Sequence, residues 1–135
     1  MPITSGALAQ NFPTKPVRMI VPFTAGSNID IIARPIGQKL SEIWGQSVVI
    51  ENRPGAGGTL GAGLVAKSQP DGYTLLLNSS AQAINPSLYA SLPYEHTRDF
   101  VEIAALVSQP YVLVVGPTAD TAPVTVCEKL AEDAA

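Results

Sequence analysis

Two short polar stretches contain the residues of this chain that are best suited to bind a small anion. Each follows an apolar run that is typical of a β-strand. If a helix begins after the stretch, its free backbone N–H groups and the positive end of its dipole attract a carboxylate without any lysine. Small residues also let a ligand approach the backbone. The candidate ligand residues are Pro22, Phe23, Thr24, Ala25, Gly26, Ser27 and Asn28 in the first stretch, and Asn78, Ser79, Ser80 and Ala81 in the second.

An alternative explanation for both stretches is purely structural. Ser27 and Asp30 have the S-x-x-D spacing of a helix cap, in which the hydroxyl and the carboxylate accept hydrogen bonds from free backbone N–H groups. Small polar residues are also common in tight turns. From the residues alone, an anion site and a pair of capped turns both remain open.

Other kinds of site have little support. The run from Gly55 to Gly61 resembles a dinucleotide-binding loop, but Leu60 occupies the place of the last glycine in G-x-G-x-x-G, and the next strand ends without an acidic residue. We assign these glycines to positive φ angles and close packing. His96 and Cys127 are each the only residue of their type, and His96 has no nucleophile partner in the sequence. We therefore predict no catalytic residue, no metal site and no cofactor.

The elements that position the two polar stretches alternate between strand and helix. Strands are predicted over Val17–Val21, Val48–Glu51 and Tyr73–Leu77, and helices over 29–44 and Thr59–Lys67. This alternation is typical of a parallel sheet with right-handed crossovers. Because ligands of such sheets bind outside the carboxyl ends of the strands, both polar stretches are expected at the same edge.

Local signals refine these elements. Pro35 is expected to kink or split the first helix, and Gly45 is expected to end it. Asn85-Pro86 predicts a short helix that runs through Tyr89. Beyond it, the pattern predicts strands over Phe100–Val107 and Tyr111–Val115, and a capping box at Thr125–Glu128 predicts a helix that continues to the end of the chain.

The overall composition limits the possible partners. The 135 residues are enough for one domain, and the net charge of −3 with no cluster of Lys or Arg argues against a nucleic-acid partner. No apolar run approaches the ~18–20 residues that span a bilayer. Ala7-Leu8-Ala9 has the small-x-small pattern that precedes a signal-peptidase cut, without the basic and apolar regions that normally come before it.

The chain from Pro13 to Pro117 resembles the periplasmic solute receptors of tripartite tricarboxylate transporters, the TctC-like family that includes the Bordetella uptake (Bug) receptors. Four motifs in the same order carry the resemblance: VPF-x-x-G from Val21, ENRPGAGG-x-x-G from Glu51, PDGYTLL from Pro70 and LPY from Leu92. Paired glycines are usual in the first loop, whereas Gly26-Ser27 stands there in this chain.

The resemblance implies a periplasmic receptor, not an enzyme, with a type II periplasmic-binding-protein fold. Two α/β lobes close on a small organic acid, which is a di- or tricarboxylate, an amino acid or an aromatic acid. The family's ligand loops match Pro22–Asn28 and Asn78–Gln82, which adds Gln82 to the candidate site. The membrane permease subunits of the transporter are the implied protein partners.

Family members are longer than this chain, so we expect an α/β lobe with a mainly parallel sheet that is incomplete relative to the two-lobe fold. Residues 13–110 then form the first lobe, and 111–135 form the crossover strand and first helix of a truncated second lobe. Residues 1–12 are a signal-peptide remnant or a disordered N-terminus. Two functions remain open. One is an extracytoplasmic solute receptor, or a fragment of a longer one, that can associate with copies of itself. The other is a shortened paralogue that acts as an interaction or signalling module.

Overall fold

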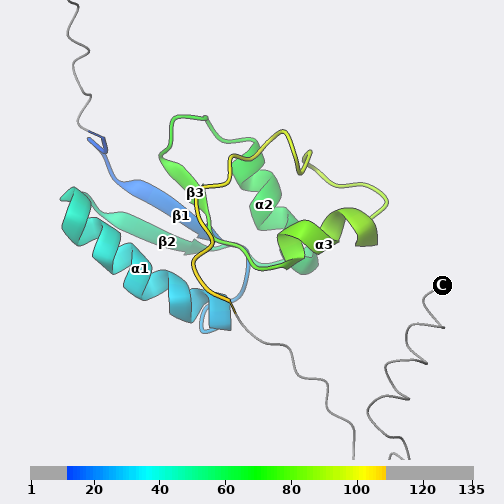
Figure 1. Cartoon of the computed structure of the whole chain (residues 1–135), viewed down its shortest axis with the longest axis horizontal. Coiled ribbons are helices and arrows are strands. Elements are labelled where there is room, and N and C mark those ends of the chain that lie inside the picture. The colour runs from blue at the N-terminus through cyan, green and yellow to red at the C-terminus, as the bar shows by residue number, and fades with distance from the viewer. Residues whose placement is uncertain (1–11, 109–135) are drawn as a thin grey trace, which may run out of the picture. The chain divides into compact units, whose positions relative to one another are not determined.

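Three parallel strands form the centre of the described part of the chain, which is residues 12–108 of a computed structural model (Figure 1). The strands are β1 (Val17–Val21), β2 (Val48–Asn52) and β3 (Thr74–Leu76), in the order β2-β1-β3. Val21 pairs with Asn52 at the carboxyl ends of β1 and β2. The predicted parallel sheet is therefore confirmed, and all three strands end at one edge.

Helices cover both faces of this sheet. Helix α1 (Asn28–Trp44) packs on one face, whereas α2 (Thr59–Ala66), which comes after the 3-10 turn η1 (Ala56–Gly58), contacts β1 and β3 from the other (Figure 1). Helix α3 (Ala81–Leu88) lies beside α2 and η1. The described residues contain no helix that is both long enough and apolar enough to cross a membrane.

The core is explained by the alternation of side chains along β1. Met19 and Val21 are buried with Ile29 and Ala33 of α1. Because neighbouring residues in a strand point to opposite faces, the residues next to Met19 and Val21 point to the other face of the sheet. On that face Pro22 lies against Gly61 of α2. Val17, Ile20 and Val21 are all completely buried, as expected for a central strand that has helices on both sides.

The ends of α1 agree with the sequence analysis, but its interior does not. Ser27 caps the start, because its Oγ accepts a hydrogen bond from the N–H of Asp30 at 3.3 Å. Gly45 ends the helix in the left-handed region and donates its N–H to the carbonyl of Ser41 at 3.0 Å. Pro35 was expected to kink or split the helix; it lies within one continuous helix, so the split is wrong. The packing of α1 on the sheet outweighs one missing backbone hydrogen bond.

The predicted start of the next helix is also wrong. Helix α3 begins at Ala81, and Pro86 lies inside it instead of at its first position. The polar stretch leads directly into the helix: Ser80 is the N-cap residue, and the Oγ of Ser79 accepts a hydrogen bond from the N–H of Ala81 at 3.2 Å. Both polar stretches are thus strand-to-helix corners, and we call them the first corner (22–28) and the second corner (78–82).

The strand predicted over Phe100–Val107 is absent from the described residues. Its β-branched and apolar residues fit a strand, but a strand needs a neighbour that accepts its backbone hydrogen bonds. None of the described strands pairs with this segment, and Val101 is 90% exposed.

The chain divides into two compact units between residues 102 and 103. Both corners belong to the first of these units, in which residues 12–102 are described. The strand predicted at Tyr111–Val115 and the helix predicted from Thr125 lie outside the described residues, as does Cys127.

Candidate functional site

The backbone N–H groups around the start of α1 find most of their acceptors within the chain. The N–H of Gly26 donates to Asp30 Oδ2 at 2.8 Å, and that of Ser27 donates to the Thr24 carbonyl at 3.1 Å. The N–H of Ile29 donates to the side-chain Oδ1 of Asn28 at 2.9 Å. Most of the backbone N–H groups at the start of α1 therefore already donate to acceptors within the chain. They are not the main donors that the start of the helix presents to solvent.

The side chains of this corner also offer hydrogen-bond donors. Ser27 Oγ and Asn28 Oδ1 both accept hydrogen bonds from the helix, so the Ser27 hydroxyl hydrogen and the Asn28 Nδ2 hydrogens remain available as donors. The Asn28 side chain is exposed and that of Ser27 is half-buried. The corner therefore offers hydrogen-bond donors to an approaching ligand, as an anion requires.

Asp30 holds the first corner in place from beneath. Its side chain is 1% exposed. Besides the N–H of Gly26, the carboxylate accepts hydrogen bonds from Arg34 Nε at 2.9 Å and from Asn52 Nδ2 at 2.9 Å. These hydrogen bonds lower the pKa of the Asp30 carboxyl to about 2, and the bond from the N–H of Gly26 has the largest effect. Asp30 is thus a permanently charged anchor, and this geometry gives no support to a role as a general base.

The sequence analysis missed the role of Asn52, the last residue of β2. Its Nδ2 donates to Asp30 Oδ1 and also to the backbone carbonyl of Phe23 at 3.1 Å. One side-chain nitrogen thus connects the end of β2 to the corner after β1 and to the buried carboxylate. The signal was present in the sequence, because β2 is parallel to β1 and Asn52 is therefore a polar residue at the same edge of the sheet.

The second corner repeats this arrangement at the end of β3. Asn78 Oδ1 accepts a hydrogen bond from the N–H of Ser79 at 2.9 Å, while Asn78 Nδ2 donates to Gln82 Oε1 at 2.7 Å. Ser79 Oγ accepts a hydrogen bond from the N–H of Ala81, which leaves its hydroxyl hydrogen available as a donor. Because Gln82 uses Oε1 to bind Asn78, its Nε2 hydrogens point elsewhere. This corner also presents donors.

Gly58 lies between the two corners and brings them together. A Cβ atom placed on Gly58 would lie 3.5 Å from Pro22 Cβ and 3.7 Å from Asn78 Oδ1. The φ angle of Gly58 is 91°, a value that side chains disfavour. The glycines of this loop therefore serve for positive φ angles and close packing, as the sequence analysis assigned them, and the packing they permit is between the two corners.

The predicted site residues do not all face a possible ligand. Pro22 is fully buried, and Phe23 packs against the core cluster. Both residues support the corner from inside. Thr24, Ala25 and Gly26 are exposed at its tip. In the second corner Asn78, Ser79, Ala81 and Gln82 are half-buried and Ser80 is exposed.

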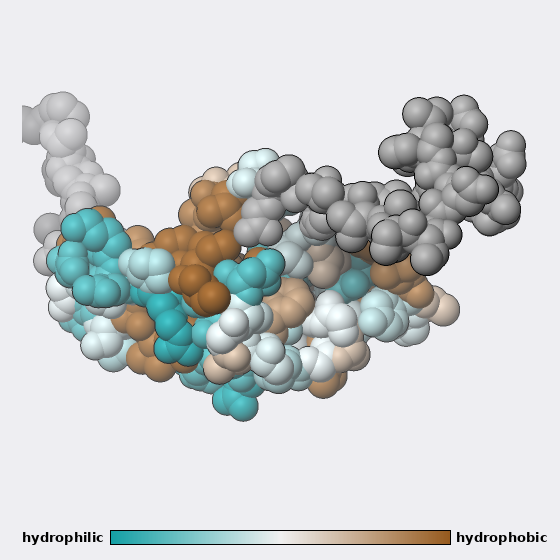
Figure 2. All heavy atoms as spheres, turned by 90° about the horizontal axis from the view of Figure 1, so that it is seen from below, coloured by the Kyte–Doolittle hydropathy of each residue, from teal (hydrophilic) through white to brown (hydrophobic). Residues whose placement is uncertain are grey.

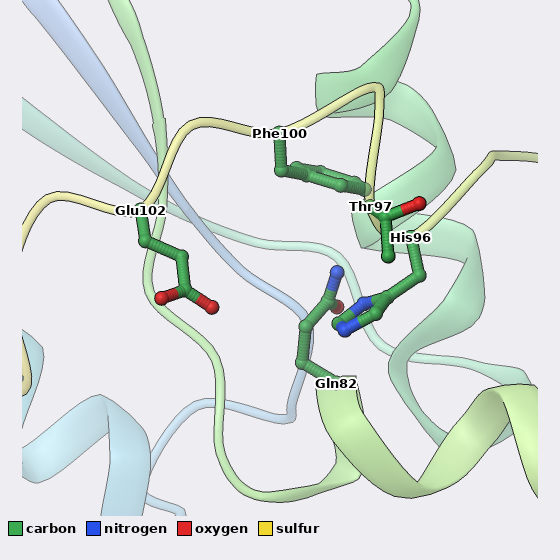
Figure 3. Close-up of a pocket in the computed structure, with 5 residues that line it drawn as sticks. All are labelled: Gln82, His96, Thr97, Phe100 and Glu102. Atoms are coloured by element: carbon green, nitrogen blue, oxygen red, sulfur yellow. The ribbon is translucent and has the colours of Figure 1, made fainter.

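A hollow of about 260 Å³ lies beside the second corner (Figure 3). Gln82 reaches it from α3, and the later segment contributes His96, Thr97, Phe100 and Glu102. The Nδ1 atom of His96 is buried and has no hydrogen-bond partner within the described residues. No group of three or more His, Cys, Asp or Glu side chains in the described part of the chain is placed to hold a metal ion.

The chain matches the family model described as the tripartite tricarboxylate transporter family receptor (TctC) over residues 32–132. Among curated relatives, protein BugT of Bordetella pertussis is 43% identical over 117 residues, which cover 85% of this chain and 36% of BugT. A UPF0065 protein from the tcbD-tcbE intergenic region of Pseudomonas sp. strain P51 is 44% identical, over 83% of this chain and 34% of that protein. The chain thus spans about a third of the length of these relatives.

Solved structures give the same result. The periplasmic binding protein BugD is 44% identical, with a TM-score of 0.64 over 66% of this chain and 30% of BugD. R. palustris Rpa4515 with adipate is 41% identical, with a TM-score of 0.61 over 63% of this chain and 29% of that one. MatC from Rhodopseudomonas palustris with bound malate is 41% identical, with a TM-score of 0.51 over 61% and 29%. The chain belongs to the TctC family of tripartite tricarboxylate transporter receptors, which are binding proteins and not enzymes.

Proposed function

We propose that residues 12–102 bind a small organic carboxylate as part of an extracytoplasmic solute receptor of a tripartite tricarboxylate-type uptake system. The observation that carries this proposal is the meeting of two donor-rich corners at Gly58, at the carboxyl edge of parallel strands. A carboxylate there can accept hydrogen bonds from Ser27, Asn28 and Ser79. Each of these side chains accepts a hydrogen bond from a nearby backbone N–H with its oxygen and keeps a donor hydrogen for a ligand.

The relatives support the ligand class. Rpa4515 has adipate and MatC has malate, and both molecules are small organic acids with two carboxyl groups. A periplasmic location and contact with membrane permease subunits are inferred for this chain by analogy with its family. The division into a first lobe at 13–110 and a second-lobe segment at 111–135 belongs to the same proposal.

A pair of matched glycine variants tests the site. Gly26 and Gly45 both have positive φ angles, 81° and 64°, and a Cβ at either position would meet nothing within 4 Å. Valine strains the backbone at both positions, but only Gly26 lies in the first corner. We expect calorimetry with adipate, succinate and benzoate to show an affinity about ten- to a hundredfold lower for Gly26→Val, the equivalent of one charge-assisted hydrogen bond.

Two further variants complete this experiment. Gly45→Val should destabilise the chain to a similar degree and leave the affinity unchanged. Ser27→Ala should weaken binding less than Gly26→Val does, because the other donors of the corner stay in place. Equal affinities for Gly26→Val and the unaltered chain would rule out the first corner as the carboxylate site.

A second candidate, an interaction module, is favoured by apolar side chains at the surface. Leu60 of α2 is 60% exposed, and Ile84 and Leu88 of α3 are 49% and 71% exposed. Figure 2 shows apolar residues among hydrophilic ones on the face turned to the viewer. Exposed apolar patches commonly mark protein interfaces. Binding of no carboxylate, together with stable self-association, would favour this function over a receptor.

A further inference from the structure

The hollow beside the second corner includes a hydrogen-bond donor of Gln82 and an acceptor of Glu102 that have no described partner. Gln82 Oε1 is occupied by Asn78, so the donor that Gln82 can present is its Nε2 group. The acceptor is the carboxylate of Glu102, which forms no ion pair with another described residue. In Figure 3 the Gln82 side chain extends from α3 and the Glu102 side chain from the later segment.

The other residues of the hollow suit a small neutral group. The Phe100 ring forms an apolar wall, and Tyr94 holds this ring in an edge-to-face contact, with ring centroids 5.3 Å apart. The buried Nδ1 of His96 can accept or donate one hydrogen bond. A volume of about 260 Å³ is large enough for a functional group together with several waters, since each water occupies ~30 Å³ in the liquid.

We propose that this hollow is a subsite for an uncharged group with one acceptor and one donor, such as a carboxamide, at the far end of an acid whose carboxylate binds the two corners. The amide oxygen accepts from Gln82 Nε2, and the amide N–H₂ donates to Glu102. A second carboxylate at this position would lie next to Glu102 and be repelled, whereas an ammonium group would leave Gln82 Nε2 without an acceptor. Glu102 is therefore the residue that sets this preference, an inference that rests on the proposed function.

The hydrogen bond between Gln82 and Asn78 connects the hollow to the junction of the two corners, so that one ligand can contact both. The hydrogen bond of 2.7 Å between Asn78 Nδ2 and Gln82 Oε1 fixes which end of the Gln82 amide faces the hollow. Asn78 in turn lies beside Gly58, at the junction of the two corners. A ligand of moderate length can thus contact the corners with its carboxylate and Gln82 with its other end.

The test compares adipate with its monoamide, adipamate, because the two differ only in the charge and hydrogen-bonding pattern at one end. His96 is the only histidine of the chain, so its imidazole signals in an NMR spectrum cannot be confused with those of another histidine. We expect adipamate to shift the His96 imidazole signals and to bind about tenfold more tightly than adipate, the equivalent of 1.4 kcal/mol. Glu102→Gln should remove this preference.

Glu95→Gln is the matched control, because it removes the same charge from the same segment at a residue that does not line the hollow. It should keep the preference for adipamate. The proposal is overturned if both ligands shift the backbone amides of the corners while adipamate leaves the His96 signals unchanged, or if Glu102→Gln keeps the full preference. If neither ligand shifts the corner amides, the proposed carboxylate site itself is wrong.

Discussion

At the scale of single residues, Asn52 stabilises the first corner through one side-chain nitrogen. Asn52→Ala removes the donor to both the Phe23 carbonyl and the buried carboxylate of Asp30. We expect the free energy of unfolding to fall by about 1.5–3 kcal/mol, the usual cost of losing a hydrogen bond to a charged group. Urea denaturation measures this change.

The control for Asn52→Ala is Gln38→Ala. The exposed Gln38 side chain makes only a long contact of 3.5 Å with Glu42. Its removal should change the free energy of unfolding by less than about 0.5 kcal/mol. Equal effects of the two substitutions would show that the connection between β2 and the first corner does not contribute to stability.

The acid sensitivity of the fold depends on two carboxylates. The pKa of Asp30 is lowered to about 2, first by the N–H of Gly26, and that of Glu51 is lowered to about 2, first by the hydrogen bond from Arg18. Because both values lie below those of the unfolded chain, the folded state binds fewer protons over this range. The stabilisation is complete above the unfolded pKa values of about 4 and is lost as the pH falls through about 2.

The corresponding measurement is urea denaturation at several pH values between neutrality and about 2. Asp30→Asn should be less stable than the unaltered chain at neutral pH and should lose less stability on acidification. If the variant and the unaltered chain lose stability in parallel as the pH falls, Asp30 is not part of the acid response.

The sequence predicted which residues form the corners but not which of their atoms face a ligand. The cap at Ser27 is indicated by the S-x-x-D spacing, whereas the partner of Asp30 is the N–H of Gly26 and not that of Ser27. Which backbone N–H donates to Asp30 depends on the φ angle of Gly26 and on the position of Asn52, which comes from another strand. Contacts between residues distant in sequence have no local signal.

At the scale of elements, α2 lies close to β1 because Gly61 has no side chain. A Cβ on Gly61 would lie 2.7 Å from Pro22 Cβ and 2.9 Å from the Arg53 carbonyl oxygen. Alanine favours a helix by about 1 kcal/mol over glycine, but overpacking costs about 1–3 kcal/mol. Since the Arg53 carbonyl belongs to the backbone and cannot rotate away, we expect Gly61→Ala to be net destabilising by thermal or urea unfolding.

Gly63→Ala in the same helix is the comparison. Its Cβ would lie 3.0 Å from the ring of Pro93, which belongs to a loop that can move by a few tenths of an ångström. Gly63→Ala should therefore cost less than Gly61→Ala. The reverse order would contradict the close contact between α2 and the first corner.

Periodicity predicted the three strands and the first two helices because each of these elements has an apolar face that packs on a neighbour. It was wrong about 100–107, where β-branched residues have no strand beside them among the described residues. The helix start expected at Asn85-Pro86, which rested on the preference of proline for the first helical position, was also wrong, because α3 begins at Ala81 with Ser80 as its N-cap residue and contains Pro86 in its interior.

At the scale of the whole molecule, exposed apolar residues predict self-association. Leu88 and Ile84 of α3 and Leu60 of α2 are the relevant side chains, and the outer edges of β2 and β3 have no strand partner among the described residues. We expect light scattering to show dimers or larger species as the concentration rises, and Leu88→Ser to reduce them. A stable monomer at high concentration would contradict this expectation.

The binding of a carboxylate at the junction of the corners competes with a simpler alternative, attraction to positive charge. Lys15, Arg18 and Lys67 line another hollow, next to the amino ends of β1 and β3 and thus at the opposite edge of the sheet. Lys15 is paired with Asp71 and Arg18 with Glu51, whereas Lys67 forms no ion pair within the described residues. A carboxylate bound by charge alone would go to this hollow, and to Lys67 in particular. One bound by oriented donors would go to the corners, where residues 22–28 and 78–82 include no Lys or Arg and the nearby Arg34 is paired with Asp30.

Backbone amide NMR of the chain during a titration with adipate shows most directly which of the two edges of the sheet binds the carboxylate. We predict that the largest shifts fall on Asn28 and Ser79, with smaller ones at Gly58, and that the amides of Lys15 and Lys67 stay in place. Shifts confined to Lys15, Lys67 and their neighbours, with the corner amides unchanged in a folded chain, would contradict the central claim that the two corners form the carboxylate site.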